Sequence, residues 1–223
     1  MVDDAKRQTS FGLENEKFSD FKRLEEEQIE LAKKVIKQDV FSRLKTIGGL
    51  DVGFNHDKIY CSAVVCDYKN MSILESQSVE NECKIRYIPG FRAQRELKAM
   101  IEAFNKLKQK PDILLLNASG MLHPRKCGLA SHLGIMLDQP VIGITKTLLC
   151  GKLNNDEILI DNELVGKELF GNEKLRKVYV SVGHKISVDK SVEIVKNCTH
   201  PPHRMPEPLH LASQLVRKNM KRG

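Results

Sequence analysis

The sequence lacks the features that mark a secreted or membrane-bound protein. None of its apolar runs reaches the length needed to cross a bilayer, and its first residues do not form a signal peptide. Its six cysteines include no Cys-x-x-Cys pair, which favours reduced thiols in an intracellular protein. We therefore expect a cytoplasmic protein with no membrane partner.

Internal repeats, low-complexity segments and interdomain linkers are also absent. A chain of 223 residues is long enough for one α/β domain with a sizeable core. We expect one monomeric domain over residues 1–223, of which residues 1–15 are flexible. Lysine and arginine outnumber aspartate and glutamate by 36 to 29, a modest excess that favours a polyanionic partner but does not identify one.

Hydrophobic periodicity predicts an α/β fold with a mixed central sheet. Three β-rich runs, at residues 46–54, 58–68 and 73–79, are joined by short polar connections that favour antiparallel hairpins. Continuous apolar runs at residues 112–116 and 141–144 are typical of buried strands. A helix at residues 129–137 between them completes a βαβ unit.

Further helices flank this predicted sheet. Amphipathic spacing indicates helices over residues 17–38 and 91–108. Another helix is capped by Ser187, and a last one follows residues 206–208. The runs at residues 157–160, 163–165 and 177–182 predict a further small sheet.

Three polar residues near the apolar runs suggest a metal site. Asp51 lies inside an apolar strand, where burying an unpaired carboxylate is expensive, so a cationic group should face it. Glu96 lies four residues before Met100, at the edge of a core-facing stripe, and Asn117 ends a buried strand. Each has a local alternative: a strand-end aspartate, an ion pair of Glu96 with Arg92 on a solvated face, and a turn-forming asparagine.

Basic and aromatic residues lie close to the same segments. His123, Arg125 and Lys146 come just after the two apolar strands, where positive donors can meet a phosphate. Tyr87 lies in a segment too irregular for a strand, so its ring should project from the surface and stack against bases. The alternative is a ring packed into the core.

The motifs around these residues resemble those of the endonuclease V family. GGLDVGF at residues 48–54 resembles its first strand, and YIPGF at residues 87–91 resembles its wedge segment. The stretch over residues 120–134, with HPR at 123–125, is similar to its most distinctive motif. VIGITK at residues 141–146 follows in the family's order, and the resemblance extends from about residue 47 to residue 215.

The resemblance implies an RNase H-like fold and a Mg²⁺-dependent endonuclease, with Mn²⁺ as another possible ion. Its partner would be single- or double-stranded DNA or RNA that contains inosine, cut at the second phosphodiester 3′ to that base. The resemblance assigns catalysis to Asp51, Glu96, Asn117, Lys146 and His123, with the metal on Asp51, Glu96 and Asn117. It assigns the wedge to Tyr87, Ile88 and Pro89, and the base pocket to Gly90, Ala118, Gly120 and Gly143, with Arg125 and Ser213 as additional site residues.

Three departures from the family pattern weaken this expectation. Asn117 and Ala118 stand where the family has aspartate and glycine, and Ser213 stands where it usually has histidine or aspartate. An amide oxygen ligates a metal without adding negative charge, so metal affinity and rate should fall. The methyl group of Ala118 should narrow the pocket. Two alternatives to weakened catalysis stay open: a module that binds inosine or junctions without cutting, and an RNase H-like phosphodiesterase with another substrate.

Overall fold

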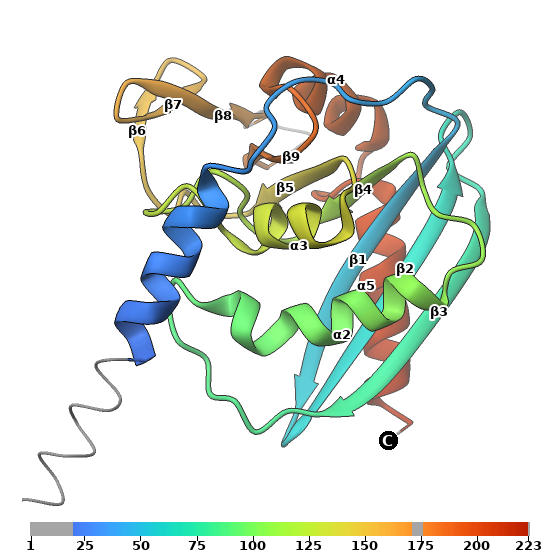
Figure 1. Cartoon of the computed structure of the whole chain (residues 1–223). Helices are drawn as coiled ribbons and strands as arrows, with labels where there is room; N and C mark the ends of the chain where they lie inside the picture. The colour runs from blue at the N-terminus through green and yellow to red at the C-terminus, as the bar shows by residue number, and fades with distance from the viewer. Residues whose placement is uncertain (1–19, 171–175, 223) are drawn as a thin grey trace, which may run out of the picture.

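One continuous sheet organises the protein, whose computed structural model describes residues 20–170 and 176–222. The nine strands follow the order β3-β2-β1-β4-β5-β9-β8-β7-β6 (Figure 1). The strands β1 (Thr46–Asn55), β2 (Lys58–Asp67) and β3 (Ile73–Glu82) pair as antiparallel hairpins. β4 (Ile113–Leu116) is parallel to β1, and β5 (Val141–Thr145) is parallel to β4. The predicted α/β class, with three antiparallel strands and a βαβ unit, is confirmed.

The strands predicted as a separate small sheet belong to this same sheet, so that prediction was wrong. β9 (Val178–His184) pairs antiparallel with β5, and β8 (Glu163–Leu169) pairs with β9. β7 (Glu157–Ile160) and β6 (Lys152–Asn154) extend the edge further. The free edge of β5 offers unpaired backbone groups to β9, a long-range pairing that local sequence patterns do not reveal.

Helices cover both faces of the sheet. α2 (Arg92–Lys106) and α3 (Leu129–Leu137) lie on one face, and α4 (Val188–Cys198) and α5 (Glu207–Met220) lie on the other (Figure 1). Ser187 caps α4 as predicted, because its side chain accepts a hydrogen bond from the backbone of Lys190. Within the described ranges, none of the helices is long and apolar enough to cross a membrane.

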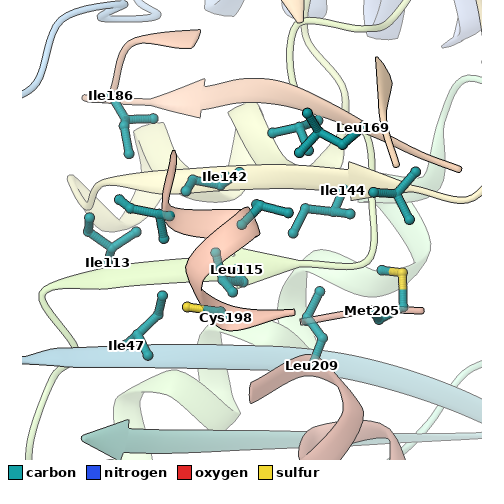
Figure 2. Packing of buried hydrophobic residues seen from close by; sticks show 14 of the residues in the cluster. Ile47, Ile113, Leu115, Ile142, Ile144, Leu169, Ile186, Cys198, Met205 and Leu209 are labelled. Atoms are coloured by element: carbon teal, nitrogen blue, oxygen red, sulfur yellow. The ribbon is translucent and has the colours of Figure 1, made fainter. Parts of the chain in front are cut away.

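Two buried clusters fill the space between the sheet and these helices. On β4, Ile113 and Leu115 point into the cluster under α4 and α5, whereas Leu114 and Leu116 point into the cluster under α2 and α3. Figure 2 shows Leu115 among side chains from α4 and α5, including Cys198. A continuous apolar strand is therefore explained by burial on both faces.

The N-terminal helix covers residues 20–32 of the described chain and ends earlier than the predicted residue 38. Beyond it, the backbone N–H of Ile36 donates to Nδ1 of His184 at 3.3 Å, and that of Val40 donates to the carbonyl of Lys185 at 3.1 Å. Val35 packs against the cluster under α4 and α5. These tertiary contacts override the local helical preference. The predicted flexible residues 1–15 lie outside the described residues.

Candidate active site

Asp51 and Asn117 lie side by side at the centre of the sheet. β1 and β4 are parallel neighbours with Leu50 opposite Leu116, so the next residue of each strand faces the other. The Nδ2 atom of Asn117 lies 3.5 Å from Oδ1 of Asp51. Two of the three predicted metal ligands are therefore adjacent.

Helix α5 lies directly over Asp51 because glycines flank that residue on the same face of β1. Side chains at positions 49, 51 and 53 share this face. A Cβ atom on Gly49 would lie only 2.2 Å from the carbonyl oxygen of Pro208, so a larger residue would push α5 away. This close packing brings the side chain of Ser213 into hydrogen-bonding contact with Asp51.

The carboxylate of Asp51 is short of positive charge. Burial raises its pKa above the usual value, and hydrogen bonds from Ser213, the backbone of Val52 and Asn117 offset this only in part. Asn117 and Ser213 are neutral donors, and the charge of Arg92 lowers the pKa least among the causes. A bound cation would supply the positive charge that these neighbours do not.

The cavity over Asp51, of about 370 Å³, is nevertheless basic. Asp51 is the single carboxylate on the described part of its wall. The guanidinium of Arg204 is fixed there, because it donates to the carbonyls of Lys146 at 2.7 Å and Lys177 at 2.6 Å. Such a cavity suits a phosphate group. Its cationic side chains are Lys146, Arg176, Arg204 and Arg217.

Glu96 does not line this cavity. It comes from α2 on the other face of the sheet, is 2% exposed, and receives hydrogen bonds from Nε and Nη2 of Arg92 at 2.9 and 2.8 Å. The alternative ion pair is thus present, but its carboxylate is buried. Nη1 of Arg92 also donates to the carbonyl of Asn117 at 3.3 Å. In the described part of the chain no three His, Cys, Asp or Glu side chains form a metal cluster, so convergence of Glu96 on the same cation stays a prediction.

Residues 88–91 form a tight turn beside a second cavity. The backbone N–H of Phe91 donates to the carbonyl of Ile88 at 3.0 Å, and Gly90 has a φ of +81°. With Pro89 at the second position, these are the features of a type II turn, which requires glycine at the third. Tyr87 precedes the turn and is 56% exposed, so its ring projects from the surface instead of packing in the core.

The second cavity, of about 290 Å³, adjoins the first. Asn117 and Lys146 line both cavities, while Tyr87, Pro89 and Gly90 line only the second. These two shared residues form the boundary between the cavities.

Three residues predicted for the base pocket, Ala118, Gly120 and Gly143, do not line the second cavity and lie behind its wall. Ala118 is fully buried in the cluster under α2 and α3, so its methyl group points into the core. A Cβ atom on Gly120 would lie 2.0 Å from the carbonyl of Val182, and one on Gly143 would lie 2.5 Å from the backbone nitrogen of Gly120. These two glycines allow close backbone packing of the segment after β4.

His123 lines the second cavity with both ring nitrogens engaged. Its Nε2 lies 3.1 Å from the carbonyl of Gly90, and its Nδ1 accepts from the backbone N–H of Arg125 at 3.3 Å. Burial, with the charge of Arg125, lowers the pKa of His123 to about 4. The ring is therefore neutral near pH 7, and its contacts favour holding the turn over transferring protons.

Several site residues were not foreseen from the sequence. Arg217 lies four residues after Ser213 on α5, and helical spacing could have indicated it. Arg204 lies in an irregular segment and reaches the cavity through long-range backbone contacts, for which the sequence carries no local signal. Gln28, on the wall of the second cavity, comes from the N-terminal helix.

Three antiparallel strands followed by parallel ones, with an acidic residue at the centre of the first strand, define an RNase H-like protein. A sequence profile of endonuclease V matches residues 29–214. The chain belongs to the endonuclease V family. Endonuclease V of Dictyoglomus thermophilum is 38% identical over 193 residues, which cover 83% of this chain and 84% of that protein. That of Rippkaea orientalis is 37% identical and covers 85% and 86%.

Solved structures agree with this assignment. The crystal structure of human ENDOV superposes with a TM-score of 0.79 at 28% identity, covering 88% of this chain and 96% of that one. Endonuclease V of Ciona intestinalis, in complex with a 24mer DNA containing an inosine followed by a ribo-adenosine, gives a TM-score of 0.81 at 26% identity. It covers 92% of this chain and 99% of its own.

Proposed function

We propose that the protein recognises inosine in a nucleic acid strand and cuts that strand slowly, at the second phosphodiester 3′ to the base. The observation that carries this proposal is the pair of adjoining cavities that share Asn117 and Lys146. One is bordered by an exposed aromatic residue and a rigid turn, and the other is basic. Two structures of the Ciona intestinalis relative with inosine-containing DNA support the choice of base.

The two cavities would bind different parts of a nucleic acid strand. Tyr87 and Pro89 would wedge into the base stack, and the extruded inosine would enter the second cavity. The following phosphates would then lie over the first cavity, where Lys146 and the arginines bind and orient them. Lys146, which borders both, would stabilise charge that develops on the scissile phosphate.

The oxygen ligands beside the first cavity suit a hard divalent cation, Mg²⁺ or Mn²⁺, but would bind it with low affinity. Asp51 and Asn117 would hold it through a carboxylate and an amide oxygen. When bound, such an ion polarises the scissile phosphate and activates water. The single negative charge on this wall limits affinity, so we expect slow cleavage.

A second candidate function is inosine binding without cleavage. It is favoured by the donors to Asp51, because Asn117 and Ser213 satisfy its oxygens with neutral hydrogen bonds. Either function fits the proposed cytoplasmic location, since all six cysteines are free thiols.

A cleavage and binding assay tests these proposals. Labelled DNA and RNA strands that differ only in one inosine or adenosine should show tighter binding to inosine, and a single metal-dependent cut near it. Asp51→Asn should remove the cut and retain binding, because it keeps the shape of the residue and removes the only carboxylate on the described wall of the cavity. Equal binding to both strands contradicts both functions. Inosine-selective binding with no cut in Mg²⁺ or Mn²⁺ leaves only the second function, inosine binding without cleavage.

Tyr87→Ala should weaken binding to an inosine strand by about 1–3 kcal/mol, the usual contribution of one aromatic stacked on a base. The melting temperature should change little, because the ring is 56% exposed. Fluorescence anisotropy and thermal unfolding of the same variant measure the two effects. Unchanged affinity with a large fall in melting temperature would remove Tyr87 from the site.

A further inference from the structure

The N-terminal helix lies against the turn that carries the wedge, through residues that precede the segment matching the family at residues 29–214. The rings of Phe21 and Phe91 are 5.7 Å apart. Glu25 accepts a hydrogen bond from Nη1 of Arg125 at 3.0 Å, and the guanidinium of Arg125 stacks 4.6 Å from the Phe91 ring centre. The helix therefore contacts the turn directly and through Arg125.

The carbonyl oxygen of Gly90 is the point on which these contacts converge. It lies within hydrogen-bonding distance of Nε2 of Gln28 (2.9 Å), Nε2 of His123 (3.1 Å) and Nη2 of Arg125 (3.3 Å). Three donors around a single carbonyl fix its direction. Holding this peptide group fixes the end of the turn against the three side chains and so limits movement of residues 87–90.

Gln28 links all of these groups. The residue is 5% exposed, its Nε2 also lies 3.4 Å from the carbonyl of Cys127, and its Oε1 accepts from Nε of Arg125 at 2.6 Å. It lines the second cavity, yet its amide is fully used by protein groups. Its side chain is thus suited to hold the wall of the cavity and not to contact the base.

We propose that Gln28 is a positioning residue that sets the selectivity for inosine by fixing the turn at Gly90. The inference rests on the proposed recognition of inosine. A base enters the second cavity between this turn and the segments after β4 and β5, so a loosened turn changes the fit of every base. Selectivity should therefore fall more than overall affinity for nucleic acid, which depends on the basic cavity.

The test compares Gln28→Met with Glu26→Met, which places the same side chain on an exposed position of the same helix. Binding to strands with one inosine or one adenosine is measured on ice in Mg²⁺, with strand integrity checked. Gln28→Met should lower the ratio of the two affinities by about tenfold, as for the loss of one or two buried hydrogen bonds. Glu26→Met should leave the ratio unchanged. Hydrogen exchange at the Phe91 amide, which is bonded to Ile88, should become faster only in Gln28→Met.

A parent protein that does not prefer inosine overturns this inference together with the proposed function. A preference retained in folded Gln28→Met overturns this inference alone. If Gln28→Met does not fold, Glu25→Gln tests the inference instead. This substitution is at an exposed position and weakens the ion pair that holds Arg125. It should lower the affinity ratio roughly twofold, and an unchanged ratio there contradicts the inference.

Discussion

The variant Asn117→Asp/Ser213→Asp is expected to cut an inosine-containing strand at least about a hundredfold faster than the parent protein. Each substitution adds a charged oxygen ligand beside Asp51, and one such ligand is worth roughly 1.4 kcal/mol, or about tenfold in rate. Asn117 lies 3.5 Å from Asp51, and Ser213 is hydrogen-bonded to it, so the backbone need not move. Single-turnover rates in saturating Mg²⁺ or Mn²⁺ measure the effect.

The melting temperature gives a second reading of the same variant. Three carboxylates close together repel one another, so stability should fall without divalent ions and recover when they are added. Asn117→Asp/Ser213→Asn is the control, because it adds a neutral amide at residue 213 and should gain only the first tenfold step, about 1.4 kcal/mol. If stability recovers with metal but the cleavage rate does not rise, the charge of the metal site does not limit the reaction.

The adjacency of Asp51 and Asn117 was expected from the resemblance to the family, which places these residues on neighbouring elements of one sheet. Asp51 and Asn117 follow apolar runs that become β1 and β4, and parallel pairing then aligns them. The exposed position of Tyr87 followed from the irregular segment with proline and glycine around it. For Tyr87 the neighbours in sequence contained the information, whereas for Asp51 and Asn117 the local pattern located the two strands and the resemblance supplied their pairing.

Contacts between distant segments could not be predicted in this way. The place of β9 beside β5, the contact of the N-terminal helix with the turn and the position of Arg204 depend on which surfaces meet after folding. The spacing on α2 was compatible with both a metal ligand and an ion pair at Glu96. Only the packing of α2 on the sheet decides how deeply that pair is buried.

Arg92→Met is expected to lower the free energy of unfolding by about 3–5 kcal/mol, because it leaves the carboxylate of Glu96 buried without a partner. Glu96 is 2% exposed, and both of its oxygens accept hydrogen bonds from Arg92 in the parent protein. Denaturant unfolding measures the loss. Lys106→Met is the matched control, because it breaks an exposed pair with Glu102 at the same helical spacing on α2 and should cost less than about 0.5 kcal/mol.

The double variant Arg92→Met/Glu96→Gln separates loss of this ion pair from loss of packing. Its second substitution removes the buried charge that Arg92→Met leaves without a partner, so it should restore most of the stability that Arg92→Met loses. If Glu96→Gln alone leaves stability unchanged and removes cleavage, Glu96 acts at the metal site and the ion pair with Arg92 is not its main role. A loss of stability with cleavage retained assigns Glu96 to holding α2, through Arg92, against the segment that carries Asn117.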